Sequence, residues 1–487
     1  MRKSNHPQLR FDCVSISDLQ LNVECRDEII TLLSGLQHVY FHIELRSRLC
    51  ELVASDVNAQ SRADVGREGL SYWQILVLAV VRLGLNVDYD KLQDLCENHR
   101  SLRVMLKVGD WEEDQNFGWR RLRDTICLLR PATIKQINES IVGYGHELDS
   151  RAAERVRADS FVIETNIHYP TESSLMWDGS RKIFEVVSRL LKTIDMPGWR
   201  QADHLRKRIK EQVREVARIS ASQSPQVKRG LNEAYRKLLK RMDTLLERAR
   251  ELIAASDSLS LDLAEHGLIE QLENWIELTS RVMDTAFRRT QLGETVPNDD
   301  KLFSLFETHT QLYRRGKAGE PNQFGRLALI FEDGAGFISH YHLMDRTAQD
   351  ADVAVEQTRE AQRVHKGQII KASFDRGFHS EQNEQDIASV VNEPCMPPRH
   401  RTQYAKCLAN ASVSFHESRK SHPGIESAIG ALQCGNGLKR CRDRTEIGLE
   451  RYLGLAILGR NFHVLGKLLI ARANPKCEAA TNHRQAA

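Results

Sequence analysis

The chain has 487 residues, of which 41% are hydrophobic and 28% are charged, and its formal net charge is +3. This length supports more than one hydrophobic core, so we expect two or three domains. No apolar stretch approaches the roughly 18 to 20 uninterrupted residues of a membrane helix, and the N-terminal hexapeptide Met1 to His6 lacks the apolar stretch of a signal peptide. We therefore expect a cytoplasmic protein with no membrane partner.

The ten cysteines are scattered. The closest pair, Cys434 and Cys441, has no matching second pair, whereas zinc ribbons and fingers need tight, repeated spacing. We expect reduced, mostly buried thiols.

Residues 1–150 have the pattern of a helical N-terminal domain. Ser71 is suited to cap a nearly continuous apolar helix that Gly84 ends, and Pro131 is suited to the first turn of another helix. The short helices between them permit a helix-turn-helix arrangement. One of them carries Arg120, Arg121 and Arg123, which are candidate DNA contacts. A plain helical bundle with an arginine-bearing surface is the alternative.

The pattern changes after Ala153. Residues 156–165 are rich in β-formers, and from about Arg181 to Arg289 the pattern is helical again. This helical segment contains fifteen Lys and Arg residues but six Asp and Glu residues between Arg200 and Arg250, a local balance of +9. Such a block is typical of a polyanion-binding surface, and its densest part comprises the candidate DNA contacts Arg206, Lys207 and Arg208. The alternative is a solvated helix face, because acids occur there at helical spacing.

Strand signals return in the last third of the chain. Residues 327–331 and 337–343 flank an Asp-Gly turn and predict a hairpin, followed by a helix over 351–362 and a strand over 368–374. Alternating elements of this kind indicate a mixed sheet with helices on its faces. The expected fold class is α/β with large all-α parts.

Three acidic residues lie within otherwise apolar segments: Asp159 in the first strand, Asp375 at the end of the last, and Glu426 at a helix start. An ionised carboxylate is costly to bury unless it is paired or binds a metal, so three such acids suggest a divalent-metal site. Asp375 could instead be an ordinary acidic residue of a turn. Glu426 could instead be an acid that is favoured electrostatically at a helix start. Glu450 is the rival of Glu426 as third ligand.

The segments around these acids resemble those of Asp-Asp-Glu transposases from bacterial insertion sequences, closest to the ISNCY type. The resemblance rests on residues 157–179, 374–380 and 422–429, extends through Glu307-Thr308-His309-Thr310 and residues 451–463, and covers most of the chain from Leu70 to Leu469. It implies a ribonuclease-H-like catalytic core interrupted by a helical insertion. The expected parts are a helical N-terminal domain (1–150), the first part of the core (151–180), a basic insertion (181–318), the rest of the core with C-terminal helices (319–470) and a polar, disordered tail (471–487).

By this resemblance, Asp159, Asp375 and Glu426 are the catalytic residues and hold two Mg²⁺ ions, for which Mn²⁺ can substitute. The implied partners are double-stranded DNA, as transposon inverted-repeat ends and as target, and a second copy of the chain. The implied location is the nucleoid-associated cytoplasm of a bacterium. Both DNA cleavage and the joining of 3′-hydroxyl ends are metal-assisted attacks on phosphodiesters, so one site serves both.

Further candidate DNA contacts are Arg376, His379, Lys439, Arg440 and Trp177. The alternatives are a surface histidine for His379, a solvated basic pair for Lys439 and Arg440, and a core tryptophan for Trp177.

The chain departs from the family's tyrosine-arginine-glutamate-lysine signature. Arg419, His422 and Gln433 stand where the tyrosine, the arginine and the basic residue are expected. The alternatives to a transposase are a related nuclease that only hydrolyses DNA and a DNA-binding regulator without activity.

Overall fold

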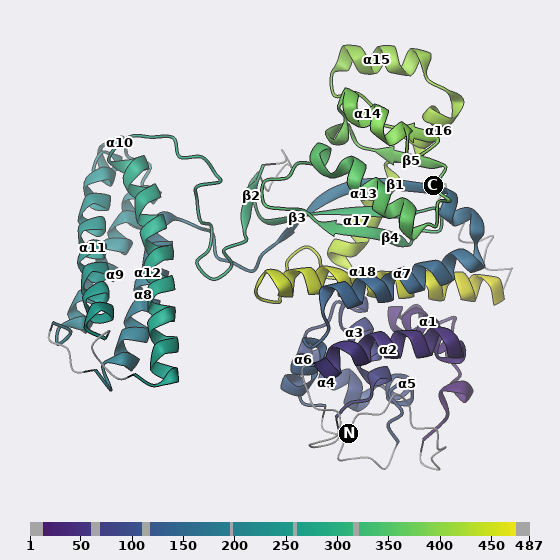
Figure 1. Cartoon of the computed structure of the whole chain (residues 1–487), viewed down its shortest axis with the longest axis horizontal. Helices are drawn as coiled ribbons and strands as arrows, with labels where there is room; N and C mark the ends of the chain where they lie inside the picture. Colours follow the sequence, from purple (N-terminus) through teal and green to yellow (C-terminus); the bar gives the residue numbers. More distant parts are fainter. Residues whose placement is uncertain are drawn as a thin grey trace. The chain divides into compact units, whose positions relative to one another are not determined.

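A computed structural model describes residues 13–59, 69–109, 117–194, 198–256, 261–314 and 321–473. The chain forms two compact units (Figure 1). Unit 1 comprises Met1–Asn166 and Arg326–Ala487, and unit 2 comprises Ile167–Gly325. The second unit is therefore an insertion in the sequence of the first.

Unit 1 begins with helices, as the sequence predicts. Ser71 caps α3 in a reciprocal capping box with Gln74, and Pro131 occupies the first turn of α7. The helical elements are η1 (Ile16–Asp18), α1 (Glu28–Phe41), α2 (Ile43–Ala59), α3 (Tyr72–Gly84), α4 (Tyr89–Asn98), α5 (Arg100–Met105), α6 (Trp119–Ile126), α7 (Pro131–Leu148) and η2 (Ser150–Glu154).

A mixed six-stranded sheet follows. Its strands are β1 (Arg155–Glu164), β2 (Gln311–Tyr313), β3 (Gln323–Asp333), β4 (Ile338–Leu343), β5 (Lys371–Phe374) and β6 (Glu393–Cys395). The order is β2-β3-β1-β5-β6, and β4 also pairs with β3. β1, β5 and β6 run parallel, whereas β3 and β4 form the predicted antiparallel hairpin. The short strand β2, which was not among the predicted elements, pairs with the start of β3.

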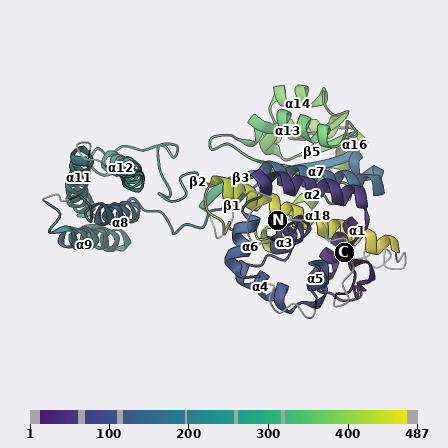
Figure 2. The ribbon, with the colours of Figure 1, turned by 60° about the horizontal axis from the view of Figure 1, so that its bottom comes forward.

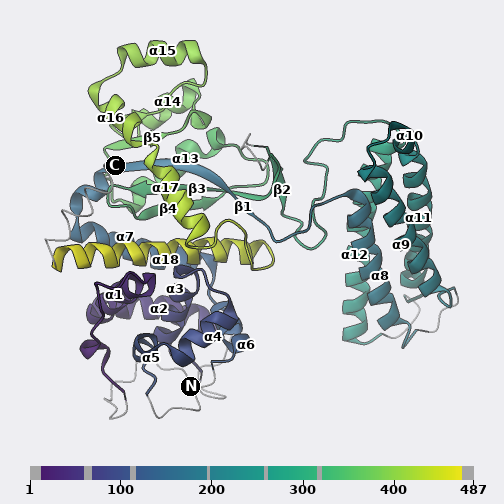
Figure 3. The same ribbon diagram turned by 180° about the vertical axis from the view of Figure 1, so that it is seen from behind.

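Helices cover both faces of this sheet. α13 (Asp350–Val364) lies on one face in Figure 1, and α17 (Gly424–Cys434) crosses the other face in Figure 3. The remaining helical elements of unit 1 are η3 (Arg376–Phe378), α14 (Glu381–Ala388), α15 (Arg401–Asn410), α16 (Val413–Ser421) and α18 (Glu446–Ala473).

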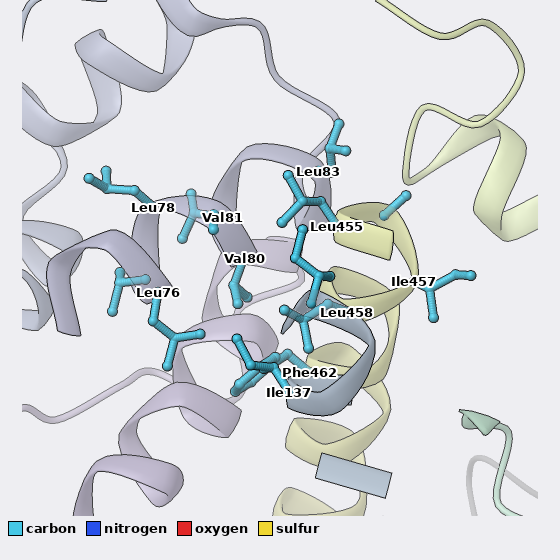
Figure 4. Close-up of a cluster of buried hydrophobic side chains, with 14 of the residues drawn as sticks. Leu76, Leu78, Val80, Val81, Leu83, Ile137, Leu455, Ile457, Leu458 and Phe462 are labelled. Carbon is cyan, nitrogen blue, oxygen red and sulfur yellow. The ribbon is translucent and has the colours of Figure 1, made fainter. Parts of the chain in front are cut away.

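The long helix α18 joins the N-terminal helices to the sheet. It packs against α1, α3, α7 and β4. Figure 4 shows part of the shared core, in which Leu455, Leu458 and Phe462 of α18 meet aliphatic side chains of α3. By length and composition α18 is the one helix, among the described residues, that could cross a membrane, but 72% of its most apolar window is buried inside the protein. It is consistent with the core helix of a soluble protein.

The α3 side chains labelled in Figure 4 are aliphatic: Leu76, Leu78, Val80, Val81 and Leu83. Ile137 of α7 lies in the same cluster. These side chains are fully buried. The N-terminal helices therefore share one continuous core with the sheet, and the predicted boundary at residue 150 separates no compact unit.

Unit 2 is built around four long helices, which Figure 2 shows side by side. Its helices are α8 (Glu172–Leu190), α9 (Ala202–Ala221), α10 (Pro225–Lys228), α11 (Leu231–Ser256) and α12 (Leu263–Thr290). Their apolar faces form a second core, separate from that of unit 1. A capping box between Asp262 and Glu265 begins α12, and Arg289 near its end pairs with Glu172 at the start of α8.

The unit boundaries differ from the predicted ones. The predicted limit at residue 180 falls inside α8, because the apolar residues of that whole helix pack into the bundle core. The inserted unit therefore begins at Ile167 rather than at residue 181. Of the predicted tail, residues 474–487 lie outside the described part of the chain.

Candidate functional site

Asp159 and Asp375 take equivalent positions on adjacent parallel strands. The register of β1 and β5 pairs Ala158 with Phe374; Asp159 follows within β1, and Asp375 follows immediately after the end of β5. Asp375 keeps an extended backbone, with φ −77° and ψ 167°. Strands lie about 4.8 Å apart, and residues in register point to the same face. The two carboxylates therefore leave one face at the carboxyl end of β5, with Asp159 half-buried and Asp375 exposed.

Asp350, in the first turn of α13, contacts the residue that follows Asp159 in β1. The Ser160 hydroxyl donates to Asp350 Oδ1 at 2.5 Å, while the Ser160 N–H donates to Asp159 Oδ1 at 2.7 Å. A Cβ added to Gly377 would lie 3.0 Å from Asp350 Oδ2, so the same carboxylate also lies against the turn after Asp375. Sequence reasoning misses Asp350, because nothing in the local pattern distinguishes it from an ordinary first-turn acid.

Glu426 lies in the first turn of α17, which packs against β1. Arg157, two residues before Asp159, holds the start of this helix. Its guanidinium donates to the Ser421 carbonyl at 2.9 Å and to Glu332 Oε2 at 2.7 Å. A Cβ on Gly424 would meet Arg157 Nη1 at 2.0 Å, so only glycine fits there without rearrangement. The Glu426 side chain is exposed.

His422 connects the helix that carries Glu426 to the strand that carries Asp375. Its Nδ1 lies 3.0 Å from Ser373 Oγ, two residues before Asp375. Burial, with a smaller contribution from Arg419, lowers the pKa of His422 to about 4, although the Asp375 charge acts in the opposite direction. The imidazole is therefore neutral at pH 7.

The three predicted acids thus lie within β1, directly after β5, and in the first turn of α17, which packs against β1. Within the described ranges, however, no group of three or more His, Cys, Asp or Glu side chains is arranged to hold a metal ion. The structure places the rival Glu450 elsewhere. Its charged neighbours are Lys135 of α7, Glu446 and Arg326, and burial raises its pKa.

Four candidate DNA contacts lie near the ends of β1 and β5. The Arg376 guanidinium stacks on the Tyr404 ring at 4.2 Å, and His379 Nε2 lies 3.6 Å from Glu384. Lys439 and Arg440 follow α17 and lie beside the end of β1. There the backbone of Arg440 pairs with that of Glu164 in an isolated parallel β-bridge. Both basic side chains are exposed.

The other candidates lie on helices. In α6, Arg120 and Arg123 stack on the exposed Trp119, at 5.0 and 5.4 Å, and Arg121 is half-buried. In unit 2, Arg206, Lys207 and Arg208 are exposed on α9. Trp177 of α8 is half-buried against the bundle core, with Lys210 Nζ 5.6 Å from its ring. That environment matches the core alternative for Trp177.

Two cavities, each of about 340 Å³, open at the beginning of β1 and β5. Both are lined by Arg155, Gly334 and Lys371. Asp159, Asp375 and Glu426 are not among the residues that line these two cavities.

Comparison with known proteins gave no match to a family model, to a curated protein or to a solved structure.

Proposed function

We propose that the chain is an Asp-Asp-Glu transposase, which cleaves double-stranded DNA at the inverted-repeat ends of its own element and joins the 3′-hydroxyl ends to target DNA. The observation that carries this proposal is the placement of Asp159 and Asp375 one residue past a paired register position on adjacent parallel strands. The helix of Glu426 packs against the first of these strands. The chemistry needs carboxylates from separate chain positions at one edge.

The strand order supports a ribonuclease-H-like core as part of this proposal. Such a core has a central strand flanked on one side by an antiparallel hairpin and on the other by parallel strands. Here β1 lies between β3, which pairs with β4, and the parallel pair β5 and β6. Asp159 is on the central strand.

In chemical type the three carboxylates suit Mg²⁺, because they offer hard oxygen ligands, although the described side chains are not grouped around one ion position. Asp159, Asp375 and Glu426 would hold the metal, which when bound activates the attacking oxygen and stabilises the leaving one. Arg157, two residues before Asp159, bonds to Glu332, and Asp350 bonds to Ser160, the residue after Asp159. The phosphodiester reaches the acids from solvent, since Asp375 and Glu426 are exposed. Because two element ends must be held together, the active complex contains at least two copies of the chain.

A cleavage and strand-transfer assay tests this proposal. The substrate is a duplex carrying the DNA that flanks the reading frame, incubated with a second duplex and Mg²⁺. The wild-type protein should nick the end and join it to the second duplex, and Asp159→Asn should do neither. Cleavage without joining would indicate the nuclease instead, and binding without cleavage would indicate the regulator.

A further inference from the structure

The segment between β6 and α16, residues 396–412, forms a projection that we call the basic arm. Its two ends are held together, because Cys395 Sγ lies 3.6 Å from the Phe415 carbonyl and α16 packs against β6. Between those ends, α15 buries none of its residues. Met396 and Pro397 at the start of the arm are buried, but its helix α15 adds no residue to the core.

The charge of the basic arm has one sign. Its seventeen residues contain Arg399, Arg401 and Lys406 but no Asp or Glu, and all three cations are exposed. Glu384 of α14 lies close enough for its charge to act on Cys407 of the arm, where, with burial as the larger cause, it raises the pKa of the thiol. A solvated helix surface normally mixes both signs, so an unmixed basic segment favours a polyanion as its partner.

Two contacts fasten the arm to the turn that follows Asp375. The Arg399 guanidinium donates to the carbonyl of Arg376 at 3.2 Å and to that of Gly377. The Arg376 guanidinium in turn lies 4.2 Å from the centre of the Tyr404 ring. The arm is thus attached at the candidate site itself.

From this attachment and charge we propose that the basic arm binds the phosphate backbone of duplex DNA next to the acids, with Arg401 and Lys406 as the contacting cations. Arg399 and Tyr404 are positioning residues, since their partners are within the protein. The inference rests on the proposed function and adds a surface that is not among the contacts predicted from the sequence.

The test measures binding of the full chain to a fluorescent duplex without divalent metal, between about 50 and 200 mM salt. The double variant Arg401→Gln/Lys406→Gln should bind two unrelated sequences more weakly by the same factor. Each lost phosphate contact lowers the slope of log affinity against log salt by about 0.9, so the slope should fall by about 1.8.

Two matched variants control for charge and for folding. Arg151→Gln/Lys366→Asn removes two exposed cations elsewhere in unit 1 and should leave the slope unchanged. Arg401→Lys/Lys406→Arg keeps the charge and should bind as the wild type does. An unchanged slope in the neutralised variant, or an equal loss in the distant control, would overturn the inference. The absence of DNA binding by the wild type would overturn it too. Failure of the proposed function alone would instead appear as normal binding without cleavage.

Discussion

The three acids of the candidate site are positioned by different structural elements. Asp159 and Asp375 are positioned by backbone pairing between β1 and β5, which a side-chain substitution leaves intact. Glu426 depends on the docking of α17, whose first residue Gly424 lies against the Arg157 guanidinium. The strands of the first two acids are readable from local pattern, although Asp159 lies within β1 rather than at its end. Asp350 and Arg157, in contrast, acquire their roles only through contacts distant in sequence.

Substitutions of Glu426 and of Glu450 are expected to affect the DNA cleavage rate differently. Glu426→Gln should lower the DNA cleavage rate at least about 100-fold, as loss of an electrostatic group at a reacting centre commonly does. Glu450→Gln is the matched control and should retain near wild-type cleavage, because its charged neighbours are Lys135, Glu446 and Arg326. The reverse pattern would make Glu450 the third ligand.

The lowered pKa of His422 should make the free energy of unfolding depend on pH. Its pKa is about 4 in the native state, against 6.5 for an unperturbed imidazole, so between these pH values the unfolded chain binds a proton that the native chain does not. The stability that the neutral imidazole contributes is thus complete above pH 6.5 and is lost as the pH falls toward 4, by up to about 1.4 kcal/mol per pH unit.

The variant His422→Asn, whose amide can replace Nδ1 toward Ser373, should remove this contribution. Urea unfolding at several pH values from about 7 to 4 measures the free energy of unfolding of both proteins. Equal pH slopes for the variant and the wild type would contradict the assignment.

Among the elements, α18 determines how the N-terminal helices meet the sheet. A Cβ on Gly459 would lie 2.5 Å from the Gly84 N and 2.6 Å from its Cα, so α18 and α3 are in backbone contact there. Gly459→Ala should therefore lower the free energy of unfolding by about 1 to 3 kcal/mol through overpacking.

Gly143→Ala in α7 is the matched control, because a Cβ there would have no heavy atom within 4 Å. It should raise stability by up to about 1 kcal/mol, since alanine favours the helix. Thermal or urea unfolding measures both variants, and similar effects of the two substitutions would argue against close packing of α18 on α3.

The individual elements are largely predictable from the sequence, but their grouping is not. The cap at Ser71, the hairpin of β3 and β4, and the strands of the two aspartates follow from local patterns. The predicted boundary at residue 180 divides α8, because the apolar face of a helix gives no indication of which core receives it. The β2 strand has three residues, too few for a periodic signal.

At the scale of the whole molecule, unit 2 has its own core and is continuous in sequence. We therefore expect a fragment of residues 167–310 to fold alone, with a helical circular-dichroism spectrum and one cooperative thermal transition. Leu238→Ala, which truncates a fully buried side chain of α11, should destabilise the fragment by about 2 to 5 kcal/mol. A fragment that unfolds without cooperativity would show that the bundle depends on unit 1.

In the proposed site Asp375 holds a metal ion during phosphoryl transfer. DNA cleavage by the variant Asp375→Cys, in Mg²⁺ and in Mn²⁺, tests this role most directly. A thiolate is a poor ligand for the hard Mg²⁺ and a better one for softer ions. The proposed site predicts that the variant is inactive in Mg²⁺ and regains measurable cleavage in Mn²⁺, whereas cleavage by the variant at the wild-type rate in Mg²⁺ would contradict it.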